Sequence, residues 1–467
     1  MKKFIIFLLC AVLVLSMCAC TGNPDSDESN TTTTGASTAA FSVGYGREDI
    51  TPNYPVELSG YESGRMSTGT KDPLYVTCIA ITDAEDNTVL LMTCDLGSAP
   101  TREANSVRRK VSKETGVPYE NILFASTHNH SAPYCTSIDD LLTKGSVEAA
   151  ETAMADRSAS EIYIGTAKTE KLNFVRHYLL SDGTYAGDNY GVGHSYVDYE
   201  TEADNEMQLM RFVRSEGKDI VLMNWQAHPV TGGESNSLIT ADYIGFCRLE
   251  MENELDCHFA YFQGAAGNLN PRSRFTADNL TPNADSKAHG EALANYALNA
   301  MSNLTKVEGG GIQVKSWTYT GTVRETDPEV LAAFSTFSSV YGSTGNREEA
   351  CLATGRLVNS IFTIYRHNDR VMQGATKDLP LSVVSVGDIS FAAVPYEMFD
   401  TNGKYVKDNT PFEMTFILGY CNGHEGYMPS QLSCDNGCYE YDNSYFVAGT
   451  AEELADLYLD ALAELKQ

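Results

Sequence analysis

The feature that most constrains the fold is an alternation of apolar, strand-like runs with helical stretches. The runs at 74–83 ("LYVTCIAITD") and 88–97 ("TVLLMTCDLG") read as strands, 102–116 as a helix, and 121–127 ("NILFAST") as a strand. The same order returns in "DIVLMNWQAHPV", "ADYIGFCRLEMENEL" and "HFAYFQ". Strand, helix, strand order is typical of layered α/β domains. We therefore predict an α/β fold: a single large domain with mixed β-sheets flanked by helices, over residues 41–467.

The first forty residues have a different character. Residues 1–20 combine "MKK", an apolar "FIIFLLCAVLVL" and a small-residue "SMCAC", the parts of an export signal. The ending resembles a bacterial lipobox, with Cys20 as the predicted lipidated residue and Cys18 as an alternative; a simple secretory signal is the plainer interpretation. Residues 21–40 are polar and repetitive, which predicts a disordered tether. We expect an exported lipoprotein, anchored in the cell membrane through its N-terminal lipid and facing outside.

Charge and cysteine content exclude two classes of protein. The net charge of −29 argues against a nucleic-acid partner, because phosphate contacts need a basic surface. The cysteines lack paired CxxC spacing, which argues against a structural zinc ribbon. Cys434 and Cys438 are close enough in sequence to suggest a bridge, and the sequence leaves their pairing open.

Two histidines one residue apart follow the strand-like run at 121–127, in "FASTHNHSAPY". In an extended chain, residues i and i+2 point to the same side, so His128 and His130 share one face where the strand ends. A metal ligand beside an acid, base or oxyanion donor fits this arrangement. Two solvated loop histidines fit it as well.

Other polar residues also follow apolar runs, and catalytic groups gather on such loops. Two histidines and a carboxylate, with an open position for water, are a common ligand set of catalytic zinc. Each residue also has a plainer interpretation, as a solvated loop side chain or a backbone hydrogen-bonding partner. The candidates are Asp95 in "TCDLG", His228 in "NWQAHP", Glu397 in "VPYE" and Tyr427 in "GHEGY".

The chain resembles the neutral/alkaline (non-lysosomal) ceramidase family. The resemblance is carried by "FSVGYGREDITP", "LSGY", "LLMTCDLG", "RRKVSKETGVPYENILFASTHNHSAPY", "NWQAHPV" and "FQGAAGNLNP". It implies the fold of the family's N-terminal zinc-hydrolase domain, one zinc ion per chain, and no counterpart here of the family's C-terminal immunoglobulin-like domain. The implied zinc ligands are His128, His228, Glu397 and Tyr427.

The resemblance also implies catalytic roles. His130 lies beside the metal as a substrate or oxyanion donor, and Arg176 in "NFVRHYLLSDG" matches an active-site arginine less closely. Tyr439, in the family loop "GCYE", and Asp242 are expected to line the pocket. Asp95 is expected to orient a ligand histidine, with a structural role as the alternative.

Two departures from the family concern the stretch "QGAAGNLNP". Gly264 stands where ceramidases carry a serine, and Asn268 stands where they carry an aspartate. A glycine cannot act as a nucleophile, so hydrolysis would have to proceed by attack of zinc-bound water.

The leading hypothesis is a zinc-dependent hydrolase that cleaves the amide bond of a small-molecule or lipid-like, ceramide-like N-acyl substrate. His130, Arg176 and Tyr427 would stabilise the oxyanion. One alternative is a catalytically inactive, substrate-binding lipoprotein of the same fold. A second is a zinc esterase or deacylase that acts on a substrate other than ceramide.

Overall fold

The computed structural model describes residues 40–61, 64–187, 196–271, 285–324, 328–346, 349–350, 353 and 375–467. Its compact unit runs from Ala39 to Gln467. The predicted export signal, Cys20 and the tether up to residue 39 lie outside the described residues. Within the described part of the chain, no helix is long and apolar enough to cross a membrane.

A nine-stranded mixed sheet forms the centre of the molecule. Its strand order is β14-β12-β11-β6-β1-β3-β4-β5, with the short β16 paired to β6. The pairs β4–β5 and β12–β14 are parallel, and the neighbouring pairs between them are antiparallel. The strands are β1 (Phe41–Asp49), β3 (Tyr75–Asp83), β4 (Thr88–Cys94), β5 (Ile122–Ser126), β6 (Ser158–Lys168), β11 (Glu206–Arg214), β12 (Ile220–Trp225), β14 (His258–Gln263) and β16 (Thr305–Lys306).

A four-stranded sheet of order β17-β18-β19-β21 packs against one face of the large sheet. Buried side chains of both sheets form one apolar core, in which Leu91 and Phe262 of the large sheet belong with Phe391 and Phe416 of the small one. Sheets that bury a face against each other do so by interdigitating such alternate residues. The small sheet consists of β17 (Ile312–Thr322), β18 (Thr376–Val386), β19 (Ile389–Val394) and β21 (Met414–Gly419).

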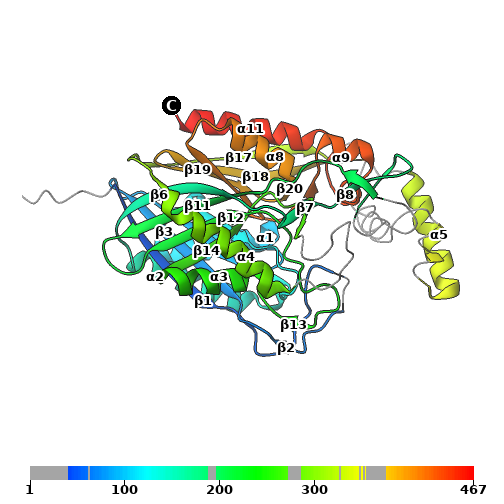
Figure 1. Cartoon of the computed structure of the whole chain (residues 1–467), viewed down its shortest axis with the longest axis horizontal. Helices are drawn as coiled ribbons and strands as arrows, with labels where there is room; N and C mark the ends of the chain where they lie inside the picture. Colours follow the sequence, from blue (N-terminus) through cyan, green and yellow to red (C-terminus); the bar gives the residue numbers. More distant parts are fainter. Residues whose placement is uncertain are drawn as a thin grey trace, which may run out of the picture. The chain divides into compact units, whose positions relative to one another are not determined.

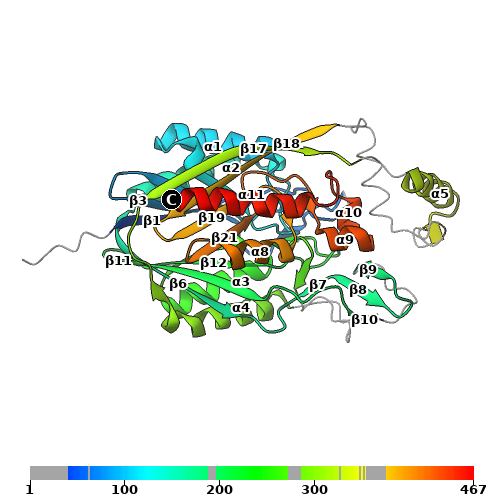
Figure 2. The same ribbon diagram turned by 90° about the horizontal axis from the view of Figure 1, so that it is seen from above.

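Helices cover both outer faces of the paired sheets (Figures 1 and 2). α1 (Thr101–Thr115) and α2 (Asp139–Ala155) pack on the β3–β5 half of the large sheet. α3 (Asp242–Leu255) and α4 (Ser286–Ala300) pack on the β11–β14 half. α8 (Asp400–Asn409) and α11 (Thr450–Leu465) cover the small sheet. The four layers confirm the predicted α/β architecture of mixed sheets flanked by helices.

Shorter elements connect these layers. The remaining elements are β2 (Gly69–Thr70), β7 (Asn173–Val175), β8 (His177–Leu180), β9 (Tyr185–Gly187), β10 (Tyr196–Tyr199), β13 (Leu238–Ile239), β15 (Leu269–Pro271), β20 (Glu397–Met398), β22 (Tyr427–Met428), α5 (Pro328–Thr344), α9 (Gln431–Asn436), α10 (Tyr439–Asp442) and the 3₁₀ turns η1 (Tyr119–Asn121), η2 (Cys135–Ser137) and η3 (Met301–Asn303).

Three strand–helix–strand units share one property that positions the candidate site. β4–α1–β5, β12–α3–β14 and β19–α8–β21 each join two parallel strands through a helix. In such units the loops after the strands' carboxyl ends are where ligands bind. The segments that follow β5, β12, β19 and β21 carry the predicted metal ligands, which are His128, His228, Glu397 and Tyr427.

Candidate metal and catalytic site

The loops after four strands bring three histidines to one carboxylate. Glu397 follows β19, and its Oε2 lies 3.3 Å from Nε2 of His128, after β5, and 3.3 Å from Nε2 of His228, after β12. Its Oε1 lies 3.0 Å from Nε2 of His424, after β21. Nε2 of His130 lies 3.2 Å from Nε2 of His128. The structure thus brings together the predicted histidines and Glu397, and it adds His424.

Main-chain carbonyls fix the orientation of two of these rings. His128 Nδ1 lies 2.8 Å from the Gly97 carbonyl oxygen, and His228 Nδ1 lies 3.0 Å from that of Leu269. A carbonyl oxygen can only accept a hydrogen bond, so each Nδ1 carries the proton. In the neutral ring, Nε2 then presents a lone pair toward Glu397.

The charge state of this cluster follows from its burial. Burial lowers the pKa of His228 to about 4, so its ring is neutral near pH 7. Burial would raise the pKa of Glu397, but the surrounding rings of His128, His228 and His424 hold it well below its usual range. An anionic carboxylate therefore faces a neutral ring nitrogen at 3.3 Å, with no proton between them.

These residues fit a divalent metal ion. His228 is fully buried, and among the described residues its Nε2 has no hydrogen-bond partner, because its contact with Glu397 joins two acceptors. Imidazole nitrogens and a carboxylate are ligands that zinc accepts. Two groups could hold an ion, His128/His130/His228 and His128/Glu397/His424, with ligand atoms within 4.8 Å of one another. A cation among these acceptors would satisfy His228 Nε2.

Backbone conformation and stacking hold the cluster in place. His128 and Tyr420 both have left-handed backbones, with φ of 64° and 54°. Their rings stack at 4.0 Å, and the Tyr420 hydroxyl donates to Glu397 Oε2 at 3.3 Å. Residues kept in such sparsely populated conformations need strong support from their surroundings, and they concentrate at functional sites.

Arg176 and Tyr427 form a second group of polar side chains beside Glu397. Tyr427 in β22 is the register partner of Glu397 in β20, and Arg176 Nη2 lies 3.1 Å from the Tyr427 hydroxyl. The Tyr439 ring meets the Tyr427 ring edge to face at 5.9 Å. Arg176, Tyr427 and Tyr439 therefore lie together, next to the carboxylate that faces the histidines.

Asp95 does not have its expected role as the residue that orients a ligand histidine. Its carboxylate accepts from Arg248 Nη2 at 2.6 and 2.8 Å and from the Tyr75 amide at 2.9 Å. This buried ion pair ties β4 to α3. Main-chain carbonyls orient the histidines instead, so Asp95 has the alternative, structural role.

Asp242 fixes the loop that follows His228. It has a left-handed backbone, and its carboxylate accepts from the amides of Thr231 and Gly232 at 3.3 and 3.0 Å. It also accepts from the Thr231 hydroxyl and from the Tyr243 amide, so its oxygens bind neighbouring groups of the chain, which makes Asp242 a support for the site rather than a pocket wall.

Gly264 and Asn268, the two positions expected to depart from the family, each have a close packing partner. A Cβ atom at Gly264 would lie 2.7 Å from Gln226 Oε1, so a side chain there would press on Gln226. Asn268 Nδ2 donates to Asp400 Oδ1 at 2.7 Å, and the Asp400 amide donates back to Asn268 Oδ1 at 3.0 Å. Asn268 thus pairs with a buried carboxylate.

Sequence reasoning missed His424, His177 and Glu440. His424 stands three residues before Tyr427 in the "NGHEGY" stretch, so the same signal that selected Tyr427 was available for it. His177 and Glu440, adjacent in sequence to the candidates Arg176 and Tyr439, lie 2.6 Å apart (Nε2 to Oε2) although 263 residues separate them. No local pattern indicates that pairing.

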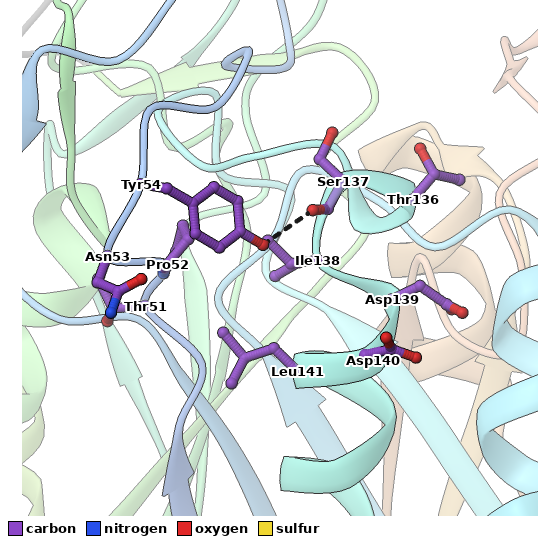
Figure 3. Close-up of a pocket in the computed structure, with 10 residues that line it drawn as sticks. All are labelled: Thr51, Pro52, Asn53, Tyr54, Thr136, Ser137, Ile138, Asp139, Asp140 and Leu141. Carbon is purple, nitrogen blue, oxygen red and sulfur yellow. Dashed lines mark hydrogen bonds between the residues drawn. The ribbon is translucent and has the colours of Figure 1, made fainter.

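A separate pocket of about 500 Å³ lies between the loop 51–54 and residues 136–141 (Figure 3). The Tyr54 hydroxyl donates to the Ser137 carbonyl oxygen across it, at 3.2 Å. Asp139 and Asp140 of α2 line it, and none of its ten lining residues is a candidate site residue. Its ionisable carboxylates are those of Asp139 and Asp140, and no histidine lines it.

The comparisons with known proteins identify the family. The fold and the histidine–carboxylate cluster are those of a layered α/β protein with a candidate metal site. Residues 41–297, more than half of the chain, match the family described as neutral/alkaline non-lysosomal ceramidase, N-terminal. The chain belongs to this family, which confirms the resemblance inferred from the sequence.

Curated relatives and solved structures agree with this assignment. The neutral ceramidases of Drosophila melanogaster and Drosophila pseudoobscura pseudoobscura are each 25% identical, over 237 and 238 residues. These matches cover 47% of this chain but only 33% of each relative, so the chain matches about a third of their length.

Two solved structures share the fold. A structure described as ceramidase complexed with C2 has a TM-score of 0.70 at 18% identity, over 92% of this chain and 75% of that one. The neutral ceramidase from Pseudomonas aeruginosa has a TM-score of 0.68 at 17% identity, over 91% and 74%.

Proposed function

We propose that this protein is a zinc-dependent hydrolase that cleaves the amide bond of a ceramide-like N-acyl substrate. The observation that carries the proposal is the approach of the His128 and His228 Nε2 atoms to one anionic carboxylate, Glu397, beside the Arg176–Tyr427 pair. Family membership supports amide hydrolysis as the reaction.

His128, His228 and Glu397 would hold the metal, with Tyr427 beside Glu397 as the fourth predicted ligand. His424 is a further candidate, since its Nε2 lies 3.0 Å from the second oxygen of Glu397. When bound, zinc would polarise the acyl carbonyl and lower the pKa of a water molecule toward neutrality.

The chain's own residues would bind the substrate and move the protons. Arg176 and Tyr427 present N–H and O–H donors that can stabilise the negative charge developing on the acyl oxygen. His130, at the edge of the cluster and only partly buried, can hold or release a proton through its ring nitrogens. This division of roles needs no serine at position 264, where a side chain would press on Gln226.

The predicted lipid anchor at Cys20 would keep the domain near lipid-like substrates. That part of the proposal rests on the sequence of residues 1–20 and is independent of the site. Labelling of Cys20 with a radioactive fatty acid in cells, compared with Cys20→Ser, tests it; equal labelling of both proteins would contradict it.

The test of the reaction is the release of free amine from a short-chain N-acyl sphingosine, with a matched O-acyl ester as the second substrate. We expect amine release that a chelator abolishes and that added zinc restores. A fall in kcat of roughly 100-fold or more is expected in Tyr427→Phe, because an oxyanion donor and a predicted metal ligand are lost together. Cleavage of the ester alone would favour an esterase, and substrate binding without cleavage would favour a binding protein.

A further inference from the structure

A buried histidine outside the metal cluster lies between two carboxylates. His177 Nδ1 is 3.1 Å from Glu200 Oε2, and His177 Nε2 is 2.6 Å from Glu440 Oε2. The three side chains are at most 3% exposed. Ionised carboxylates only accept hydrogen bonds, so both ring nitrogens must carry protons, and the ring is an imidazolium cation.

The same carboxylate also binds the arginine of the candidate site. Glu440 Oε1 lies 2.6 Å from Arg176 Nε and 2.5 Å from Arg176 Nη2. Nη2 of that guanidinium also donates to the Tyr427 hydroxyl at 3.1 Å and to the Gly267 carbonyl at 3.0 Å. Glu440 thus lies between two cations, His177 and Arg176, and the guanidinium of Arg176 reaches the Tyr427 hydroxyl of the candidate site.

We propose that Glu440, held in place by the imidazolium of His177, is a positioning residue that directs Arg176 toward the acyl oxygen of the substrate. This inference rests on the proposed function, because it assigns a role to Arg176 in the same reaction. A guanidinium held by a carboxylate on one edge has its remaining N–H groups fixed in direction, since the fork is planar and rigid.

Charge balance explains why both carboxylates are present. Two cations, Arg176 and His177, face two anions, Glu200 and Glu440, in a buried setting where an unpaired charge would be costly. Glu200 is itself held by Ser433 Oγ at 2.5 Å and Asn436 Nδ2 at 2.8 Å, both in α9.

Cys438 does not convert this cluster into a second metal site. His177, Cys438 and Glu440 place one ligand atom each within 4.8 Å of the others. However, both nitrogens of His177 are engaged by carboxylates, and Cys438 Sγ accepts from the Tyr441 amide at 3.3 Å, as the cap of α10. The Phe399 ring, 5.7 Å from His177, closes another side of the imidazole with an apolar group.

The pKa of His177 agrees with the geometry. Burial lowers it, but the carboxylates of Glu440 and Glu200 raise it to about 9. Because the folded-state pKa lies above the ordinary 6.5, the contribution of this charge to stability is complete below about 6.5 and is lost as the pH rises through about 9.

The first test needs no substrate. Nitrogen NMR of the full chain with ¹⁵N-labelled histidine, assigned with His177→Gln, should show both ring nitrogens of His177 protonated at pH 7.5, with loss of a proton near pH 9. In Glu200→Gln we expect that titration to shift down by about one pH unit or more. A neutral His177 at pH 7.5 would overturn the proposal.

The second test separates positioning from metal binding. In Glu440→Gln we expect kcat to fall by about 10- to 100-fold, KM to change by less than about twofold, and the zinc content to stay the same. Glu252→Gln, which breaks the Arg47–Glu252 pair on other elements, is the matched control and should keep wild-type kcat.

The kcat and zinc content of Glu440→Gln distinguish a positioning role of Glu440 from no role in the reaction and from a role in metal binding. An unchanged kcat in Glu440→Gln, or a loss of zinc, would overturn the positioning role. If Glu440→Gln does not fold, Glu200→Gln is measured in its place. A kcat of Glu200→Gln equal to that of the wild type at every pH up to 9 would overturn the positioning role of Glu440. If the wild-type protein cleaves no amide, the proposed function is refuted. The NMR experiment would still show whether His177 is charged, because it needs no substrate.

Discussion

At the scale of single residues, unusual backbone conformations gather around the histidine cluster. Of the seven non-glycine residues with positive φ in the described part of the chain, four lie in or beside it: His128, Asp242, Tyr420 and Asn422. Each such conformation costs of order 1–3 kcal/mol and persists only because the surrounding contacts enforce it. Asn422 shows how it is enforced, because its side chain accepts from the Phe124 amide at 2.9 Å and its own amide donates to the Phe124 carbonyl.

Gly60 offers a test of how tightly His130 is held. A Cβ atom at Gly60 would lie 2.3 Å from His130 Cγ, whereas one at Gly64 would meet nothing within 4 Å, and both glycines have φ of +93°. Gly60→Ala should therefore cost about 2 kcal/mol more than Gly64→Ala, because both introduce the same backbone strain but only the first displaces the ring. Urea unfolding of the two variants measures this difference, and equal midpoints would contradict the contact.

Asn268, one of the two expected departures from the family, contacts a buried carboxyl group. Burial raises the pKa of Asp400, its partner, to about 6. Asn268→Asp would place two carboxylates in contact, so they would share a proton at low pH and repel each other when both ionise. Because the folded-state pKa of Asp400 is raised, ionisation of the two carboxyls at higher pH destabilises the folded Asn268→Asp variant. We expect its loss of stability relative to the wild type to grow with pH, to about 3–5 kcal/mol at pH 8.

Urea midpoints at pH 5 and pH 8 measure that loss. The double variant Asn268→Asp/Asp400→Asn exchanges the two groups and should recover most of the stability at pH 8. If the midpoint of Asn268→Asp is shifted from that of the wild type by the same amount at pH 5 and pH 8, the two carboxyls do not interact.

At the scale of elements, glycines set the distance between α2 and the large sheet. Cβ atoms at Gly44 and Gly46 of β1 would lie 2.1 and 2.0 Å from the carbonyl oxygens of Ala153 and Ala149 in α2. The helix backbone therefore rests directly on the strand backbone. α2 packs on the same half of the large sheet as β5, the strand that precedes His128.

Gly46→Ala tests the close packing of these two elements. The neighbour of the new methyl group is backbone and cannot rotate away, so α2 must shift, at a cost of about 2–3 kcal/mol. Gly69→Ala in β2, where a Cβ would meet Leu238 at an ordinary 3.4 Å, is the control and should change stability by less than about 0.5 kcal/mol. Thermal unfolding of both variants checks this, and equal melting temperatures would show that α2 tolerates the methyl group.

The sequence predicted those parts of the site that depend on local order. His128, His228 and Glu397 each follow a buried strand, and strand ends are readable from hydrophobic runs. The pairings that complete the site were not readable, because they join distant segments: Arg176 pairs with Glu440, 264 residues away, and Asp95 pairs with Arg248, 153 residues away. Periodicity carries no information about such pairs, which is why the role expected for Asp95 was wrong.

At the scale of the whole molecule, a metal would link three separate parts of the chain. His128, His228 and Glu397 belong to the three strand–helix–strand units, so an ion bound by all three stabilises the folded state against the unfolded one. At a free zinc concentration 100 times Kd, linkage predicts about 2.7 kcal/mol of added stability. Calorimetry with and without a chelator should show a lower melting temperature in the metal-free protein, and no shift would contradict binding across the units.

The most direct test of a zinc site at His128, His228 and Glu397 is the metal content of the purified protein. His228→Gln is compared with His289→Gln, because His289 is also buried, also has its pKa lowered to about 4, and lies outside the cluster, against Trp225 and Tyr243. Elemental analysis should find about one zinc per chain in the wild type and in His289→Gln, and almost none in His228→Gln. If the wild-type protein contains no zinc and takes up none when zinc is added, the cluster of His128, His228 and Glu397 is not a zinc site.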